Sequence, residues 1–400
     1  MARRQSERLE LIASENYVSA AVRAALTSPF EDLTIEGYPG RRLHGPNEIA
    51  DELELAAIGR AAQLFGCRYA NVQPHSGTQA NQAVYLATLR PGDVILSMNL
   101  TAGGHFSHAA TSAALSGYRS VHYGLGPDGI DMSQVERLAR AHRPRIIVCG
   151  ASSYPRAIDF AGLARIAHAH GALLMADIAH VAGLVAQGLF PNPFPAADIV
   201  TTTTYKNLRG PRGGLILTND PELAGRIDAA VCPGLQGVPS VGAIAAKAVA
   251  FGEALAPAFW GYANRSLSLA RTLAAELIAR GYQIHMGGTD TPLVVLDFAR
   301  SDLSVAHLVA TLDAAGIGAN AVPLPGDCSF AEARGLRLGL SAMATRGTTP
   351  EAMAEIAEIL TSAINEVGKR ADSPSNQALT DLRRRVLVLT ARYPVPARTT

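Results

Sequence analysis

The sequence predicts an α/β fold built on a large, mainly parallel sheet, and three observations lead to this prediction. Short apolar runs alternate with helix-length segments from Ile49 to about Gly225. Two of these runs are followed at their carboxyl end by a polar residue, Asp177 or Lys206. A second, shorter pattern of helices and strands begins near Ala270. Strands that alternate with helices form parallel sheets, and such sheets bind ligands at the carboxyl ends of their strands.

The composition is that of a folded, globular protein, with 48% hydrophobic and 17% charged residues in a chain of 400. A formal net charge of +1 gives no electrostatic basis for a nucleic acid or an anionic membrane as partner. No apolar stretch like that of a signal peptide follows Met1–Arg8, and no uninterrupted apolar run reaches about 18 residues. Neither metal-ligand nor disulfide spacing relates the four cysteines, Cys67, Cys149, Cys232 and Cys328. We therefore expect a cytoplasmic protein without a metal site.

Three parts are expected along the chain: an N-terminal arm (1–48), a large domain (49–268) and a small α+β domain (269–400). In the large domain, helical periodicity covers Ala50–Phe65, and strands are predicted at Asp93–Met98, Arg145–Cys149, Leu173–Ala176, Asp198–Thr203 and Gly214–Thr218. In the small domain, a helix should end at Arg280, followed by strands near Gln283–Met286 and Leu293–Asp297 and helices at Ser304–Ala315 and Pro350–Asn365.

The stretch Thr201–Gly214 is the best candidate for a reactive centre. Four threonines and Tyr205 lead into Lys206, and a loop rich in glycine and proline follows. A lysine at the end of a buried strand can be desolvated, which lowers its pKa and frees the amine to form a Schiff base; the alternative is a solvated loop lysine. Asp177 ends the preceding strand and is either a helix cap or the carboxylate that holds a pyridinium nitrogen protonated. Together, Lys206 and Asp177 favour pyridoxal phosphate as cofactor.

Three further groups could complete such a site. Ser76, Gly77 and Thr78 stand at the start of a predicted helix, where backbone N–H groups and hydroxyls suit a phosphate, although an ordinary helix cap explains them as well. His105, in a glycine-rich turn, could stack on a cofactor ring or be merely structural. Arg337 lies in an apolar strand and requires an anionic partner, either a substrate α-carboxylate or an internal carboxylate.

From Leu9 to its tail, the chain resembles the serine hydroxymethyltransferase family of fold-type I pyridoxal phosphate enzymes, which implies a seven-stranded sheet in the large domain. The resemblance rests on short segments in the right order: Glu10–Asn16, Glu36–Arg42, Ala70–Asn81, Asn99–His105, Asp177–Val185, Thr201–Gly214, Pro233–Gly237 and Arg337–Gly347. The family forms dimers or pairs of dimers with shared active sites, so the resemblance implies a homodimer.

The resemblance also implies a role for each matching residue. Lys206 corresponds to the Schiff-base lysine, Asp177 to the pyridinium partner and His105 to the stacking histidine. The phosphate would be bound by Ser76, Gly77, Thr78 and, from the neighbouring subunit, Gly237. The implied cofactor contacts also include Ser152 near the 3′-oxygen, with Ala179, His180 and Thr203 beside it. Ser14 and Arg337 resemble the clamp on the amino-acid carboxylate, and Glu36 resembles the acid–base glutamate.

The chain departs from the family pattern where folate would bind. Tyrosines are replaced by Thr34, Leu43 and His44, and the histidine before the lysine is Tyr205. Val238 replaces a glycine beside the phosphate cup, and Leu324 stands where an asparagine would contact the pterin. Aliphatic side chains offer neither the stacking face of an aromatic ring nor the hydrogen bonds of an amide.

These departures lead us to expect a folate-independent transaldolase or aldolase. Such an enzyme would cleave the Cα–Cβ bond of L-threonine or L-serine, with Glu36 or His44 as base, and an aldehyde would capture the glycine quinonoid. Thr34 would then contact a bulkier substrate, and Tyr205 would tune the reaction. The alternative is a folate-dependent hydroxymethyltransferase acting on serine or α-methylserine. A non-catalytic binding subunit is a further alternative, which the intact Lys206 and Asp177 oppose.

Overall fold

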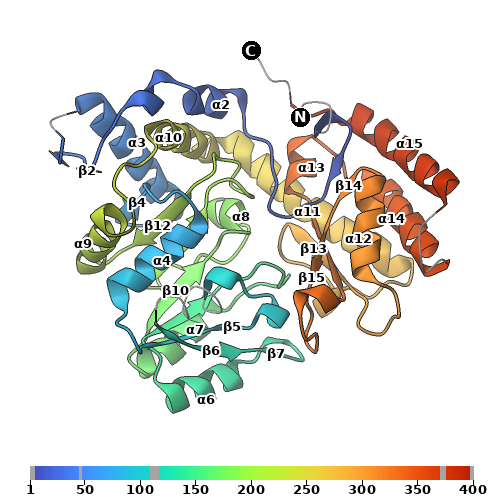
Figure 1. Ribbon diagram of the computed structural model, residues 1–400, viewed down its shortest axis with the longest axis horizontal. Helices are drawn as coiled ribbons and strands as arrows, with labels where there is room; N and C mark the ends of the chain where they lie inside the picture. Colours follow the sequence, from blue (N-terminus) through green and yellow to red (C-terminus); the bar gives the residue numbers. More distant parts are fainter. Residues whose placement is uncertain (1–4, 45–46, 109–116, 370–374, 397–400) are drawn as a thin grey trace.

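The computed structural model describes residues 5–44, 47–108, 117–369 and 375–396 (Figure 1). Part of the segment on which the signal-peptide prediction rests, 1–4, lies outside these ranges. A seven-stranded sheet forms the centre of the larger body. Its spatial order is β4 (Tyr69–Asn71), β12 (Gly214–Thr218), β11 (Ile199–Thr203), β10 (Leu173–Asp177), β9 (Ile146–Cys149), β5 (Val94–Met98) and β6 (Arg119–Tyr123). The strands from β11 to β6 pair in parallel, whereas β12 is antiparallel to both of its neighbours.

Both faces of this sheet are buried, and the residues of β9 show how. Ile147 and Cys149 point into one hydrophobic cluster, while Ile146 and Val148 point into another on the opposite face. Continuous apolar runs are typical of strands in a parallel sheet covered by helices on both sides. Among the described residues, the helices of this part of the chain are α2 (Ala20–Leu26), α3 (Glu48–Phe65), α4 (Gly77–Thr88), α6 (Met132–His142), α7 (Phe160–Ala169), α8 (Ala182–Ala186), α9 (Pro221–Ala229) and α10 (Val241–Leu255).

The second body is built on a three-stranded antiparallel sheet with the order β13 (Leu293–Asp297), β16 (Gly335–Gly339) and β15 (Asn320–Val322). Figure 1 shows its elements gathered on the right, beside the large sheet. Its helices are α12 (Val305–Ala314), α13 (Ser341–Thr345), α14 (Ala352–Lys369) and α15 (Asn376–Arg392). The N-terminal segment also reaches this body, because β1 (Leu9–Glu10) pairs in parallel with β14 (Ile317–Gly318). The remaining strands form two short hairpins: β2 (Gly37–Tyr38) with β3 (Arg41–Arg42), and β7 (Leu125–Gly126) with β8 (Gly129–Ile130).

The prediction of an α/β fold with a large, mainly parallel sheet is confirmed, and the predicted strand at Leu293–Asp297 matches β13. Of the strand predicted near Gln283–Met286, the structure keeps only a single antiparallel bridge between Ile284 and Leu296 of β13. A short 3-10 turn follows at His285–Gly287, in which Met286 has a φ of 57°, and Gly287 and Gly288 also have positive φ. Extended backbone cannot continue through such left-handed residues. The predicted boundary at 268/269 falls inside α11 (Pro257–Ala279), so the division into domains stays a prediction.

In the described part of the chain, no single helix is long and apolar enough to cross a membrane. By length and composition alone one pair of helices could, α10 with α11, which is bent by 84°.

Candidate active site

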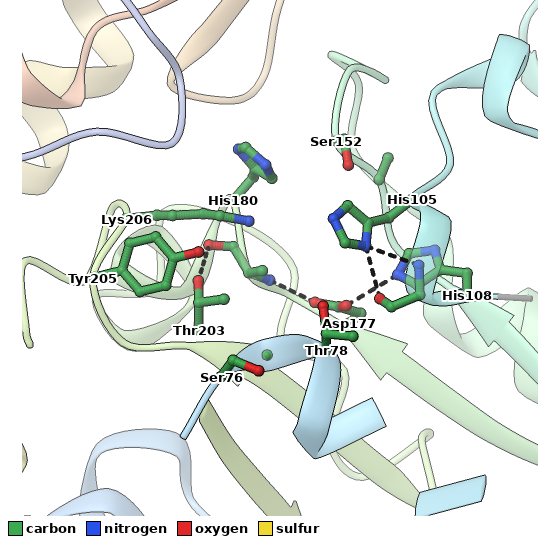
Figure 2. A pocket seen from close by; sticks show the side chains of 14 residues that line it. Ser76, Thr78, His105, His108, Ser152, Asp177, His180, Thr203, Tyr205 and Lys206 are labelled. Carbon is green, nitrogen blue, oxygen red and sulfur yellow. Dashed lines mark hydrogen bonds and ion pairs between the residues drawn. The ribbon is translucent and has the colours of Figure 1, made fainter. Parts of the chain in front are cut away.

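One pocket lies where the carboxyl ends of β5, β9, β10 and β11 meet the amino terminus of α4 (Figure 2). Parallel pairing places these strand ends at the same edge, with Asp177 of β10 opposite Thr201 of β11. The pocket brings together most of the residues predicted from the sequence. Its lining consists of Ser76, Gly77, Thr78, His105, Ser107, His108, Ala151, Ser152, Asp177, Ala179, His180, Thr203, Tyr205 and Lys206.

Asp177 is an ionised carboxylate at the floor of this pocket. Its Oδ2 accepts hydrogen bonds from His108 Nε2 at 3.0 Å and Asn81 Nδ2 at 2.9 Å, and its Oδ1 accepts one from the backbone N–H of Ala179 at 3.0 Å. Burial raises the pKa of Asp177, but these hydrogen bonds and the nearby charge of Lys206 outweigh burial and hold the pKa well below its usual range. A carboxylate fixed in this way can hold a proton on a cationic ring nitrogen.

Lys206 is buried, and its ammonium has no hydrogen-bond or ion-pair partner among the described residues. Burial lowers the pKa of Lys206 to about 8, an effect that the charge of Asp177 opposes and that of Arg337 reinforces. The backbone at this point is held firmly, since the carbonyl of Lys206 accepts a hydrogen bond of 2.9 Å from Asn16 Nδ2. The structure therefore presents an amine that deprotonates far more readily than an exposed lysine.

Two histidines of the pocket, His105 and His180, are held uncharged. His105 Nδ1 lies 2.7 Å from Ser107 Oγ, and Asn81 donates to the same oxygen at 2.9 Å. Burial, reinforced by the neighbouring His108, lowers the pKa of His105 to about 4, and burial also holds the pKa of His180 well below its usual value. A neutral, oriented imidazole such as His105 can lie against a flat ring without adding charge.

The amino terminus of α4 faces the same pocket. Ser76 caps this helix by accepting a hydrogen bond from the N–H of Gln79 at 3.1 Å. Gly77 cannot be replaced by a residue with a side chain unless Thr203 moves, because an added Cβ would lie 2.6 Å from Thr203 Cγ2. Free N–H groups at a helix start attract phosphate, so the capping role and the phosphate role predicted for Ser76 are compatible.

Arg337 projects from β16 into a second pocket of about 350 Å³ that adjoins the first. Its guanidinium donates to the carbonyl of Ser152 at 2.9 Å and to Asn320 Oδ1 at 2.8 Å, while its Nε is buried without a partner. Burial lowers the pKa of Arg337 to about 10. Within the described ranges no carboxylate pairs with it, so the internal salt bridge considered from the sequence is not observed. A buried guanidinium of this kind is suited to an anionic ligand.

The remaining predicted residues fall into two groups. Ser14 lines the second pocket, and Ser152, His180 and Tyr205 line both pockets. Glu36, His44 and Gly237 line neither pocket but lie together: Glu36 Oε2 is 2.7 Å from His44 Nε2, and a Cβ on Gly237 would be 2.8 Å from Glu36 Oε1. Thr34 is exposed and is also absent from both linings.

Several residues of the site were not foreseen from the sequence. His108 and Asn81 hold Asp177, and each could have been suspected only from its proximity in the chain to His105 or to Ser76. Phe106 and Phe330 stack at the second pocket, with ring centroids 4.9 Å apart and planes inclined by 27°. No sequence signal joins these two phenylalanines, because they come from distant parts of the chain.

The donor set fits pyridoxal phosphate. A desolvated amine, an ionised carboxylate below it, a neutral imidazole and a helix amino terminus surround one pocket. Together with the parallel sheet, this arrangement defines a pyridoxal-phosphate-dependent enzyme of the fold-type I class.

The chain belongs to the serine hydroxymethyltransferase family, whose model, described as "Serine hydroxymethyltransferase", matches residues 1–360. It is 49% identical to a serine hydroxymethyltransferase of Synechococcus sp. (strain JA-3-3Ab), over 98% of this chain and 93% of that protein. It is 48% identical to the serine hydroxymethyltransferase of Rhodospirillum centenum, over 98% and 92% of the two chains. A third relative, serine hydroxymethyltransferase 1 of Bordetella parapertussis, is 49% identical over the same shares. The protein is therefore a pyridoxal-phosphate-dependent transferase that acts on a small amino acid.

These relatives overturn the prediction of a folate-independent transaldolase or aldolase with an aldehyde acceptor. All three are named serine hydroxymethyltransferases, and the chain matches each of them over nearly its full length. The two leucines on which that prediction rested, Leu324 and Leu43, do not line the pockets. Leu324 is 2% exposed and packs in a small apolar cluster with Ala13, Leu293, Val295 and Val322, so its side chain does not line the pocket. Leu43 is 63% exposed and lines neither pocket of its own chain.

Proposed function

We propose that this protein catalyses the reversible transfer of the hydroxymethyl group of L-serine to tetrahydrofolate, which yields glycine, methylenetetrahydrofolate and water. One observation carries the proposal: Lys206 belongs to two adjoining pockets at once. The first is polar and suits the cofactor. The second contains the unpaired cation of Arg337 and a stacked aromatic pair, which suit an amino acid and a planar acceptor. The names of the relatives support the same reaction.

In this proposal the cofactor is held by residues of the first pocket. Lys206 would bond to its aldehyde carbon, Asp177 would hold its ring nitrogen protonated, and His105 would cover its ring. Its phosphate would lie at the amino terminus of α4, beside Ser76–Thr78. When bound, pyridoxal phosphate withdraws electrons from the Cα of the amino acid attached to it.

The residues of the second pocket orient the amino acid. Arg337 has a buried Nε free for a carboxylate oxygen, and Ser14 lines the same pocket. A carboxylate held there would lie beside the Lys206 amine and fix which bond of Cα faces the cofactor ring. Because the pKa of Lys206 is about 8, its amine can accept and return a proton near neutral pH.

The acceptor would occupy the outer part of the second pocket. Phe106 and Phe330, each about half exposed, form a stacked pair there, with Leu100 and Pro323 in the same lining. Flat apolar faces of this kind suit a pterin or aminobenzoyl ring. They offer the stacking surface whose absence at Leu43 suggested a folate-independent reaction.

A second copy of the chain would complete the site. Glu36, His44 and Gly237 are close together but line neither pocket of their own chain. We infer that the protein is a homodimer in which this cluster reaches the neighbouring Lys206, where the Glu36–His44 pair moves the proton of the substrate hydroxyl. Mixing the inactive variants Lys206→Ala and Glu36→Gln should then restore activity, because one site of each hybrid dimer is intact. No recovery after subunit exchange would contradict the shared site.

The reaction itself is tested by conversion of L-serine to glycine with and without tetrahydrofolate. We expect a strong acceleration by tetrahydrofolate and stoichiometric formation of methylenetetrahydrofolate. Parallel assays with α-methyl-L-serine establish the substrate range. Glycine formation at the same rate without tetrahydrofolate would refute the proposal.

A further inference from the structure

Lys247 is a fully buried lysine to which none of the roles above gives a function. It lies on α10, is 1% exposed, and donates hydrogen bonds to three backbone carbonyls. These are Val72 O at 2.5 Å, Pro74 O at 3.1 Å and Gly214 O at 3.0 Å. The first two acceptors lie in the loop between β4 and α4, and the third is the first residue of β12. A single side chain thus joins α10 to two segments that are far apart in the sequence.

The number of acceptors indicates an ammonium ion. A protonated lysine has three N–H donors and no acceptor, whereas a neutral amine would direct its lone pair at one of the carbonyls. In the described part of the chain no carboxylate forms an ion pair with Lys247. Burial lowers the pKa of Lys247 to about 7, and the more distant charge of Glu54 opposes this effect. The carbonyl oxygens therefore surround the charge much as they would surround a bound monovalent cation.

The carbonyls that hold Lys247 lead directly to the amino terminus of α4. Pro74 is two residues before Ser76, and its carbonyl also accepts the N–H of Gly214 at 2.8 Å. Packing here is tight: a Cβ on Gly213 would lie 2.4 Å from Lys247 Cε, and one on Gly214 would lie 2.3 Å from the carbonyl of Ser76. Any shift of the ammonium must therefore displace the turn that positions Ser76.

We propose that Lys247 is a positioning residue whose ammonium acts as a built-in cation, holding the 72–76 segment in the conformation that binds the cofactor phosphate. This inference rests on the assignment of Ser76–Thr78 to the phosphate under the proposed function. Without the cation, three carbonyls would face one another and the segment would relax. The fraction of protein with a competent phosphate site would then fall, and the apparent affinity would fall by the same factor.

The test compares pyridoxal phosphate with pyridoxal, which lacks the phosphate. Dissociation constants are measured by absorbance titration of the apoenzyme for wild type, Lys247→Met and Thr78→Val. We expect Lys247→Met to weaken pyridoxal phosphate binding by about tenfold and leave pyridoxal binding within about twofold. Equal weakening of both ligands, or of neither, would overturn the role of Lys247. If Thr78→Val leaves the preference for pyridoxal phosphate over pyridoxal unchanged, the assignment of Ser76–Thr78 to the phosphate is wrong. That outcome does not depend on the result for Lys247→Met.

Chemical rescue tests the charge directly. In Lys247→Ala, methylammonium or ammonium chloride should restore binding of pyridoxal phosphate by at least about threefold, whereas tetramethylammonium chloride at the same ionic strength should not, since it has no N–H donor. Equal effects of all three salts would contradict the built-in cation.

If the Lys247 variants fail to fold, Gly213→Ala provides the test. It keeps the lysine but displaces its Cε, and Gly225→Ala, at a position with open space, is the matched control. A pyridoxal phosphate affinity unchanged in Gly213→Ala would overturn the proposal.

Discussion

Asp177 is tied to His108 by a hydrogen bond of 3.0 Å between its Oδ2 and the histidine Nε2, and the opposite ring nitrogen of His108 is buried without a partner. The ring of His108 therefore donates to the carboxylate and to nothing else in the described part of the chain. It orients the one side chain that can hold a ring nitrogen protonated.

Replacing His108 by leucine should weaken cofactor binding and move the acidic limit of activity to higher pH. The pKa of Asp177 is kept low partly by this hydrogen bond, so its loss lets the carboxylate protonate at a higher pH. The measurement is the pH profile of kcat/KM, with His108→Gln as the variant that keeps a donor. A pH profile unchanged in His108→Leu would show that the hydrogen bonds from Asn81 and Ala179 are enough to keep the pKa of Asp177 low.

The rate at which Lys206 reacts with an aldehyde should rise around pH 8, rather than around 10.5, the ordinary pKa of a lysine. Its folded-state pKa is lowered by burial, so the free amine that reacts with an aldehyde becomes abundant above about pH 8. The rate of cofactor uptake by the apoenzyme, measured by absorbance against pH, should show this midpoint. Because Asp177 raises the pKa of Lys206, Asp177→Asn should move the midpoint to still lower pH, and a midpoint near 10.5 in the wild type would contradict the prediction.

Arg337→Lys should raise the KM for L-serine by at least about thirtyfold, because lysine cannot reproduce the planar fork of a guanidinium on a carboxylate. The KM for tetrahydrofolate should change much less. Steady-state kinetics with each substrate varied separately distinguishes the two effects. Arg271→Lys, at a side chain that is 57% exposed, serves as the control. Similar increases in both KM values would indicate a collapsed pocket instead.

Phe330→Ala should raise the KM for tetrahydrofolate by about fivefold, since a stacked aromatic contact contributes about 1 kcal/mol. Cofactor affinity and the KM for L-serine should remain near their wild-type values. Trp260→Ala removes an aromatic side chain of comparable exposure, 49%, from outside both pockets. An unchanged folate KM in Phe330→Ala would remove the stacked pair from the acceptor site.

Leu324→Asn should destabilise the protein by about 2–4 kcal/mol without improving folate binding, because it places an amide in an apolar cluster. Leu43→Asn, at an exposed side chain, should change the free energy of unfolding by no more than about 0.5 kcal/mol. Denaturant unfolding of both variants checks this contrast. A neutral Leu324→Asn would mean that the cluster tolerates a polar group.

The large sheet was predictable because its strands are apolar runs, and the rule that ligands bind at strand carboxyl ends singles out Asp177 and Lys206 from the amino-acid sequence alone. The sequence does not predict the two strands at the sheet edges, Tyr69–Asn71 and Arg119–Tyr123. Both contain polar or exposed residues, so they lack the continuous apolar run of a central strand.

The acceptor side of the site could not be predicted in the same way. Whether Leu324 faces a pocket or a core depends on how the segment after β15 turns, and no local pattern determines that. The Phe106–Phe330 contact and the three carbonyls around Lys247 are long-range arrangements of ordinary residues. A helical lysine looks the same in sequence whether it points to solvent or to the centre of the molecule.

The parallel pairing of Leu9 with Ile317 sets the order in which the enzyme can mature. Ser14 lies four residues after the end of β1, so the amino-acid side of the pocket needs a strand made at the start of synthesis and a partner made near its end. The residues that line the cofactor pocket, and the lysine proposed to hold its phosphate turn, have by contrast all been made once Lys247 is synthesised. During translation, the chain should therefore become able to hold its cofactor well before it can hold its substrate.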